Sequence, residues 1–552
     1  MRPLGLLLAL AAAGGTLAAQ ETGERGVLEV QAVNASTGEP LPRTALTLRP
    51  FVRAGVPLHE RPPVLEATTG PDGVYRFESL EPGTYFLQAR KAGYCLRFYN
   101  PRPRSWAAAP IVVKGGKESV RVEMALLPQA VITGRVFDEE GEPVAHAAIS
   151  LERLEYSAHG RFGLHPACTA YTTDLGEFRL AGLTPGRYYL WIRARGELMI
   201  AGIPRDRDPE VETEMDYAPV FYPNSTEFAG AQPFDLEPGT EMHGMDVRLR
   251  KSPVYRVRGR VQDHGGPGTP GEVRLVAVGQ SVFAALTGPQ TKVRPDETFE
   301  FAGVPPGDYE VQARPAEGVS AGLWRAEVRV GKQDVDNVAL ERAMPARVSC
   351  KVRIEGEEEG GLDQPPVAMT LMPVGGPPWK AVTARPMDGP RLLIENAPPG
   401  RYWVQVGGLP GRGMWLKSIL ADGREAPDEG VVVMPGASFS MTLVFATNAG
   451  EVSGVVVDKD GTPVPGSLVT LVPERAGATR MNHYRTATAG IDGRFTLPDA
   501  APGEYRAYAW EDLPGGAQHN PEFLKPHLGR SVKVEVETGG RDEVTLRVIP
   551  RP

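Results

Sequence analysis

The sequence predicts an all-β protein built as a tandem array of five similar domains, and three observations support this. The tetrapeptide Pro-Gly-x-Tyr occurs five times. Its copies are spaced by about the length of one small domain, far beyond the period of a solenoid repeat. Short stretches before each copy alternate apolar and polar residues, which indicates strands with one buried face. The motif glycines are Gly83, Gly186, Gly307, Gly400 and Gly503.

Each motif lies in a longer frame. A bulky apolar residue precedes every motif glycine by eight positions, usually after an Asp/Gly turn. Segments such as Phe495-Thr-Leu497 have period two, and the motif then turns the chain because Pro presets φ and Gly tolerates positive φ. Each frame therefore predicts a β-hairpin-like unit. The apolar residues are Tyr75, Phe178, Phe299, Leu392 and Phe495.

The start of each copy has a second pattern, with a strand, a Gly turn, a Pro and another strand. It is clearest from Gly134 to Val144 and from Gly454 to Val464. The combination G-x-V-x-D-x-x-G-x-P-(V/I) and D-x-x-G-x-F-x-(F/L)-x-x-L-x-P-G-x-Y resembles the bacterial carboxypeptidase regulatory-like module. This resemblance implies immunoglobulin-like, transthyretin-like, seven-stranded β-sandwiches. It covers nearly all of residues 26 to 549 and is weakest in the first half of the fourth copy.

The copies define five expected modules after a signal peptide at residues 1–19. Links of a few residues, often with Pro, join them and restrict domain swing. We expect a semi-rigid rod on the order of 150 Å long, with a compact cluster of side-by-side modules as the alternative. The expected modules are module 1 (26–127), module 2 (131–250), module 3 (254–342), the divergent module 4 (346–447) and module 5 (450–549).

Composition supports the fold class and limits the partners. With 64 Gly and 53 Pro in 552 residues, apolar stretches are too interrupted for the long helices of an α/β enzyme. Hydrophobic residues at 41% still suffice for packed cores. A net charge of −8 with interspersed signs gives no basic footprint for nucleic acid. We expect a monomer without cofactor whose partner is an unidentified protein or polysaccharide.

The N-terminus predicts export. Arg2 precedes an apolar run from Leu4 to Ala13, and small residues continue to Ala19. Cleavage near that position gives a periplasmic, cell-surface or secreted protein that begins near Gln20. No later stretch reaches the roughly 18 apolar residues of a membrane-spanning helix.

Two motifs suggest catalysis, but each has a simpler explanation. Ser320 lies in a Gly-x-Ser-x-Gly segment, yet a small β-module does not supply the strand, turn and helix that a nucleophile elbow needs. His519 and Glu522 match the His-x-x-Glu pair of metallocarboxypeptidases, whose catalytic domain is missing from this chain. We therefore interpret them as loop residues and expect no catalytic or metal site.

Cross-links are likewise not expected. The three cysteines occupy unrelated positions in their modules and are interpreted as buried free thiols, with a Cys95–Cys168 disulfide as the alternative. Module 4 alone has the pieces of an adhesin-type isopeptide bond, but its Glu is offset by one position and so turns to the opposite face. These pieces are Lys351, Glu395 and Asn448.

Aromatic loops of modules 1 and 2 are the candidate binding residues. Both loops follow the Pro-Gly-x-Tyr strand, and flat rings in a secreted β-sandwich can stack on sugars. The alternative is that the rings cap an open end of the sandwich. The candidates are Phe98, Tyr99, Trp106, Tyr217, Phe221 and Tyr222.

The sequence thus predicts an exported, non-enzymatic spacer or binding protein made of carboxypeptidase regulatory-like modules. Carbohydrate binding by the aromatic loops of modules 1 and 2 is the alternative. An array of small domains binds or separates other molecules more often than it catalyses, and no constellation within one copy supports an enzyme.

Overall fold

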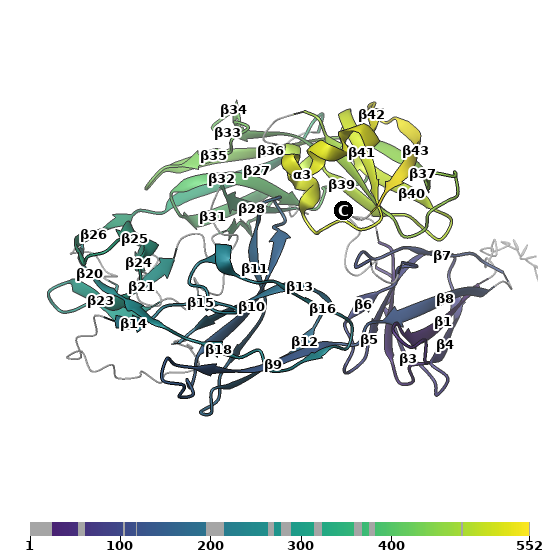
Figure 1. Cartoon of the computed structure of the whole chain (residues 1–552). Helices are drawn as coiled ribbons and strands as arrows, with labels where there is room; N and C mark the ends of the chain where they lie inside the picture. Colours follow the sequence, from purple (N-terminus) through teal and green to yellow (C-terminus); the bar gives the residue numbers. More distant parts are fainter. Residues whose placement is uncertain are drawn as a thin grey trace, which may run out of the picture.

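Nearly all of the regular secondary structure in the described residues is β-strand (Figure 1), which confirms the all-β prediction. Five hydrophobic clusters lie one within each expected module, and a smaller sixth cluster lies in module 5. The computed structural model describes residues 25–52, 61–102, 105–116, 119–194, 215–262, 270–277, 289–313, 323–357, 367–374, 381–475 and 479–550.

The first two modules each divide their strands between two sheets with an apolar core between them. Module 1 contains β1 (Gly26–Asn34), β2 (Ala45–Pro50), β3 (Leu65–Thr68), β4 (Val74–Leu80), β5 (Gly83–Arg90), β6 (Arg97–Phe98), β7 (Ile111–Val113) and β8 (Ser119–Leu126). Module 2 contains β9 (Ala130–Phe137), β10 (Ala148–Tyr156), β11 (Phe162–Tyr171), β12 (Glu177–Leu183), β13 (Gly186–Arg193), β14 (Met215–Tyr217), β15 (Val220–Phe221), η2 (Phe228–Gly230), β16 (Phe234–Leu236), β17 (Glu241–Met242) and β18 (Val247–Arg248), and β19 (Lys251–Pro253) follows it.

Modules 3 and 4 continue the pattern, and in module 3 the strands form one continuous hydrogen-bonded order. Module 3 contains β20 (Tyr255–Val261), β21 (Glu272–Ala277), β22 (Gln290–Lys292), β23 (Thr298–Val304), β24 (Gly307–Ala313), β25 (Leu323–Val330) and β26 (Val335–Ala343). Module 4 contains β27 (Ala346–Ile354), β28 (Ala368–Pro373), β29 (Val382–Thr383), β30 (Arg385–Pro386), β31 (Arg391–Ala397), β32 (Gly400–Gly407), β33 (Trp415–Ala421), β34 (Arg424–Glu425), β35 (Val431–Val433) and β36 (Ser438–Ala446).

Module 5 differs by having several short helical segments, which the sequence analysis did not predict. It contains β37 (Gly450–Val457), β38 (Leu468–Pro473), α2 (Arg480–His483), β39 (Arg485–Thr488), β40 (Arg494–Ala500), β41 (Gly503–Trp510), η4 (Ala517–His519), α3 (Pro521–Leu524), η5 (Lys525–Arg530), β42 (Val532–Val536) and β43 (Arg541–Ile549). Asn520 caps α3 by accepting a hydrogen bond from the Phe523 N–H at 2.9 Å.

All five modules share one strand connectivity. The first strand pairs antiparallel with the strand that precedes the Pro-Gly-x-Tyr turn, and parallel with strands at the end of its module. The strand after the turn pairs antiparallel with the second strand of the module. Among the described residues the two strands that flank the turn pair with different partners and not with each other, so the predicted hairpin-like unit is wrong. The turn instead connects the pairing of the first strand to that of the second strand.

The glycine of the opening pattern has a packing reason. Its register partner is the bulky aromatic residue of the hairpin frame, and a Cβ on the glycine crowds both that ring and a backbone carbonyl of the neighbouring segment. Only a residue without a side chain lets the three segments approach so closely. The pairs are Gly134 with Phe178, Gly259 with Phe299, and Gly454 with Phe495.

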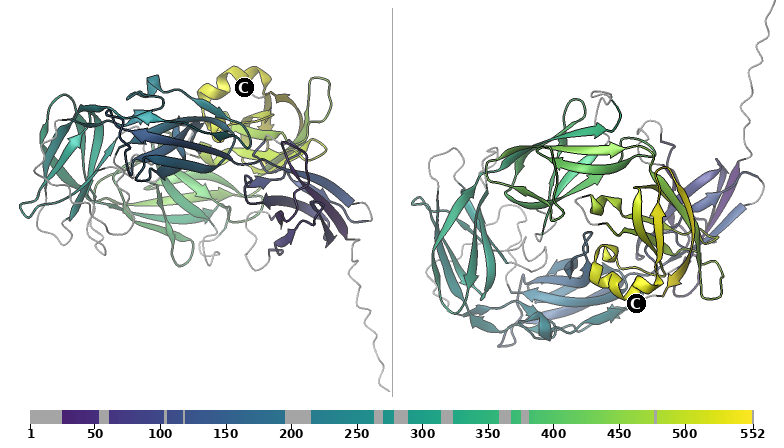
Figure 2. Two further views of the ribbon diagram at one scale, coloured as in Figure 1. Left: turned by 60° about the horizontal axis from the view of Figure 1, so that its bottom comes forward. Right: turned by 90° about the horizontal axis from the view of Figure 1, so that it is seen from above.

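Modules 2 to 5 form a closed ring, with module 1 beside module 5 (Figure 2). The ring closes where module 5 meets module 2, and there the Asn520 side chain donates a hydrogen bond to the Gly160 carbonyl oxygen at 2.7 Å. Tyr156 of module 2 also packs edge-on against Phe523, with ring centroids 5.5 Å apart. The arrangement is the compact alternative, and the expected rod is wrong because the last module folds back onto earlier ones.

Module 5 also holds its other neighbours. Asn482 makes two hydrogen bonds with the backbone of β32, accepting from Val406 N–H at 2.9 Å and donating to the Val404 carbonyl at 3.1 Å. Toward module 1, Pro465 and Gly466 present their carbonyl oxygens to side chains of the loop that follows β6. Module 5 therefore contacts modules 1, 2 and 4 and holds them together.

Candidate functional site

The aromatic loop of module 1 separates into buried and exposed rings. Tyr99 belongs to the module 1 core with 5% of its surface exposed, whereas Phe98 is 39% and Trp106 43% exposed. The buried guanidinium of Arg97 lies 4.5 Å from the centroid of the Trp106 ring and donates to the Ser105 carbonyl at 2.8 Å. Burial lowers the pKa of Arg97. Of the three candidate rings in this loop, Phe98 and Trp106 remain accessible.

The same loop also docks module 1 on module 5. The Asn100 side chain donates to the Gly466 carbonyl at 3.2 Å, and Arg102 Nε donates to the Pro465 carbonyl at 2.8 Å. Arg102 additionally forms an ion pair with Glu511 at 3.2 Å. Part of the loop is therefore an interface between modules.

The candidate rings of module 2 pack against their own module. Phe221 contacts Phe228 edge-on at 5.5 Å, and Tyr222 contacts Phe234 at 6.3 Å. Tyr217 and Tyr222 are both half-buried against the module 2 core, and the Lys251 amine lies 5.5 Å from the Tyr217 ring centroid. The structure does not bring these rings together with those of module 1.

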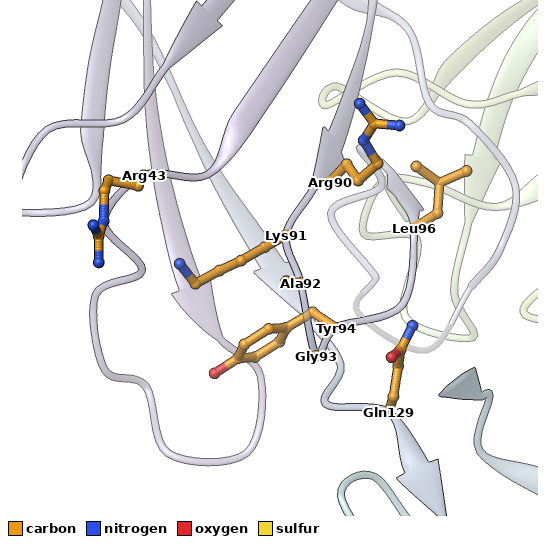
Figure 3. A pocket seen from close by; sticks show the side chains of 8 residues that line it. All are labelled: Arg43, Arg90, Lys91, Ala92, Gly93, Tyr94, Leu96 and Gln129. Atoms are coloured by element: carbon orange, nitrogen blue, oxygen red, sulfur yellow. The ribbon is translucent and has the colours of Figure 1, made fainter. Parts of the chain in front are cut away.

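A cationic cavity at the end of β5 was not identified from the sequence. It has a volume of about 510 Å³ and is lined by charged, amide and aromatic side chains and by exposed Leu96. Figure 3 shows Lys91 extending toward Arg43, and Arg90 beside Leu96. The available signal in the sequence was the Arg-Lys pair directly after the motif strand. The lining residues are Arg43, Arg90, Lys91, Ala92, Gly93, Tyr94, Leu96 and Gln129.

The cavity is built on a fixed turn. The Gly93 carbonyl accepts from the Gln129 N–H at 2.9 Å, which attaches the turn to the link between modules 1 and 2. The Lys91 amine donates to the Pro42 carbonyl at 2.6 Å, and this bond joins the turn to the segment before β2. The cavity wall therefore combines three segments that are distant in the sequence.

Phe98 lies on the same sheet face as the cavity. Phe98 pairs with Gln88 across β5 and β6, while the alternate pair, Ala89 with Arg97, points into the buried side. Because side chains alternate along a strand, Leu96 and Arg90 share the outer face with Phe98. The outer face of β2, β5 and β6 thus continues directly from the cavity to a candidate sugar-stacking ring.

The catalytic and metal alternatives have other roles where the structure describes them. The His519 ring packs against Tyr484 at 4.2 Å, and burial, with nearby His159 and Arg480, lowers the pKa of His519 to about 4. Glu522 is exposed beside Lys525 at 3.9 Å. Ser320 and residues 1–19 lie outside the described residues. Over the described ranges there is no group of three or more His, Cys, Asp and Glu residues placed to hold a metal ion.

The possible cross-links are not assembled. Glu395 pairs with Arg385 at 2.9 Å on the surface, and Asn448 lies in the link to module 5, where its carbonyl accepts from the Gly539 N–H at 2.7 Å. Cys95, Cys168 and Cys350 are free thiols. Cys95 and Cys350 are buried as expected, whereas Cys168 is only half-buried because its strand, β11, lies at the edge of a sheet.

Residues 131–199, within module 2, match the carboxypeptidase regulatory-like domain family. This match confirms the resemblance predicted from the motifs. Domains of this family are non-catalytic modules.

Several solved structures, pilins among them, are similar at low identity. The Bacillus anthracis TIE protein is 11% identical over 75% of this chain and 73% of its own, with a TM-score of 0.16. A streptococcal ancillary pilin is 13% identical over 54% of this chain and 99% of its own, with a TM-score of 0.19. GBS52, a minor pilin of Streptococcus agalactiae, is 14% identical over 41% of this chain and 97% of its own, with a TM-score of 0.23. No curated protein matches the sequence.

Helices in the described part of the chain are all too short or too polar to cross a membrane.

Proposed function

We propose that the chain is an exported, non-enzymatic binding scaffold at the bacterial cell surface or in the periplasm. The observation that carries the proposal is the contact of module 5 with modules 1, 2 and 4. A spacer gains length with every added module, whereas these contacts shorten the molecule and fix its faces relative to one another. Fixed faces favour binding because less freedom is lost when a partner docks.

The residues that resembled catalytic groups support a non-enzymatic role by what they contact. His519 belongs to the helical segment that meets module 2, where a Cβ on Gly160 lies 2.5 Å from the His519 carbonyl carbon. Glu522 is in the first turn of α3, where a negative charge is favourable. Both residues therefore have structural explanations within the ring junction.

Carbohydrate is the preferred ligand class for the scaffold, through module 1. Phe98 and Leu96 are exposed on the outer face of the sheet, next to a cavity, so a sugar can reach both. Stacking on an aromatic ring contributes on the order of 1 kcal/mol per contact, so affinity is weak for one ring and depends on several. Module 2 is a weaker candidate because its rings pack internally.

A glycan array probed with the full five-module chain tests the binding role. We expect selective binding that Phe98→Ala together with Trp106→Ala weakens, while Phe221→Ala leaves it unchanged. A chain that binds no array ligand, and whose small-angle scattering gives an extended rod, contradicts the scaffold and favours the spacer. Turnover in a peptidase screen contradicts the non-enzymatic assignment.

N-terminal sequencing tests export. Protein recovered from the periplasm or medium is expected to start near Gln20. Retention of Met1 in a cytoplasmic fraction contradicts the proposal.

A further inference from the structure

We propose that the cavity at the end of β5 binds an acidic oligosaccharide, with one carboxylate at Arg43 and Lys91, a second at Arg90, and a sugar ring toward Leu96 and Phe98. The inference rests on the binding role proposed above and names its ligand class and site. The cations of the cavity favour an acidic ligand, and its volume and apolar wall favour a sugar ring.

The turn before β2 shows that Arg43 is not needed for the fold. Arg43 has φ of 53°, and the residues at the same place in modules 2 and 5, His146 and Gly466, have φ of 56° and 69°. In these three modules the backbone N–H of this residue donates a hydrogen bond to the carbonyl oxygen of the residue just after β3, β11 or β39, at 3.0 to 3.1 Å. The acceptors are Thr69, Thr172 and Ala489. The turn requires a left-handed residue, for which Gly costs least. Module 1 keeps an arginine at this strained position, which suggests that its side chain serves another purpose.

The charge of the cavity selects an anion. Its side chains include three cations and no carboxylate. Within the described part of the chain, neither Arg43 nor Arg90 has a carboxylate partner, and both are exposed. Arginine and lysine only donate hydrogen bonds, so a ligand that only accepts, such as a carboxylate, complements them. The chain as a whole carries a net charge of −8, so this attraction is local.

The size and apolar wall of the cavity favour a sugar over a small inorganic ion. A volume of about 510 Å³ is within the range of organic ligand sites. Leu96 is 46% and Phe98 39% exposed on the adjoining face. The pyranose ring of a uronic acid has one carboxylate and an apolar C–H face, which match the cations and the apolar residues respectively.

In module 5 the position that corresponds to the cavity of module 1 is filled by aromatic side chains. The strand pair equivalent to Ala45 and Arg90 of module 1 is Leu468 and Trp510. Trp510 is fully buried, and Phe523 of α3 packs on it with ring centroids 5.6 Å apart. Module 1 has an open cationic cavity where module 5 has this aromatic plug, so an open site is specific to the first of these two modules.

Calorimetric titration of the full five-module chain tests the assignment with three probes: a diuronate, the neutral disaccharide of the same linkage, and inorganic phosphate. We expect saturable diuronate binding and binding of the other two probes that is weaker by at least about tenfold. Arg43→Gly and Arg90→Gln should each weaken diuronate binding by on the order of tenfold. Arg43→Gly keeps the turn, because Gly is the native residue at this place in module 5.

Arg121→Gln is the matched control, since this exposed arginine lies on β8, in the other sheet of module 1. It should leave diuronate affinity unchanged. If the neutral disaccharide binds as tightly as the diuronate, the ligand need not be acidic. If phosphate binds as tightly as the diuronate, the ligand need not be a sugar. Either result contradicts the proposal. If array ligands bind and their affinity does not change in Arg43→Gly and Arg90→Gln, the cavity is not the binding site, but the scaffold role stands. A chain that binds no glycan at all contradicts both proposals.

Discussion

The Tyr505 hydroxyl donates a buried hydrogen bond to the carbonyl oxygen of Ala501, four residues earlier, at 2.8 Å. The same link occurs in every module, across each Pro-Gly-x-Tyr turn, so the motif tyrosine joins the strand after the turn to the first residue beyond the strand before it. A comparable tyrosine corner stabilises other β-sandwiches. The other four pairs are Tyr85 with Glu81, Tyr188 with Thr184, Tyr309 with Pro305, and Tyr402 with Pro398.

Residues 450–552 should fold alone. Two hydrophobic clusters lie entirely within this range, so the fragment retains a complete core. We expect a β-type far-ultraviolet circular dichroism spectrum and one cooperative thermal transition. A disordered spectrum would show that module 5 needs its neighbours and that the predicted module bounds are wrong.

Tyr505→Phe should lower the free energy of unfolding of residues 450–552 by about 1–3 kcal/mol, because the buried Ala501 carbonyl loses its donor. Urea unfolding of the fragment measures the change. Tyr171→Phe in module 2 is the contrasting variant and is compared with Tyr505→Phe in the full chain: the buried Tyr171 hydroxyl has no hydrogen-bond partner in the described structure, so removing it should be neutral or stabilising. An unchanged stability of the Tyr505 variant would contradict a structural role for the motif hydroxyl.

Gly160→Ala should open the ring. Gly160 has φ of +76°, and its added Cβ lies 2.5 Å from the His519 carbonyl carbon of module 5. Backbone atoms cannot move aside as a flexible side chain can, so the variant separates modules 2 and 5. Small-angle scattering of the full chain should show a larger radius of gyration.

Gly461→Ala is the control for the steric clash that Gly160→Ala introduces. Gly461 has a similar φ of +83°, but nothing lies within 4 Å of its added Cβ. It therefore introduces the same backbone strain without the clash between modules. Equal scattering profiles for the two variants would contradict a ring held by the contact at Gly160.

The sequence predicted what repeats and missed what occurs once. The motif turn and the strand alternation recur in several copies, so each copy strengthens the interpretation of the others. The bond between Asn520 and Gly160 joins residues 360 positions apart and lies outside the repeated motifs, so no local pattern indicates it. The ring and the rejection of the rod therefore required the three-dimensional structure.

The candidate site was predictable in part for a similar reason. Phe98 and Tyr99 are neighbours near a strand end, and adjacent strand residues point to opposite faces, so only one of the two rings can be exposed. That rule predicts that the two rings lie on opposite faces, and the structure shows that Tyr99 is the buried one and Phe98 the exposed one. Arg43 reaches the cavity only through the folding of the segment before β2, whereas Lys91 lies on a different segment, after β5.

Acidification should loosen the junction of modules 2, 4 and 5. His159 of module 2 stacks on Trp403 of module 4 at 6.3 Å, and His519 of module 5 packs on Tyr484. Burial lowers the pKa of His159, and burial together with His159 and Arg480 lowers the pKa of His519 to about 4. The folded junction thus favours the neutral imidazole of each histidine.

The direction of the pH effect follows from these pKa values. An unfolded or separated His519 has a pKa of roughly 6.5, so its contribution to the junction is fully present above that pH and is lost as the pH falls toward 4. Small-angle scattering and limited proteolysis of the full chain between pH 7 and 4.5 should therefore show progressive opening. His519→Phe keeps an aromatic ring against Tyr484 without a titrating group and should flatten this dependence, while His243→Gln, at an exposed site in module 2, should leave it unchanged. A ring that opens identically in the native chain and the His519 variant would show that other groups control the acid response.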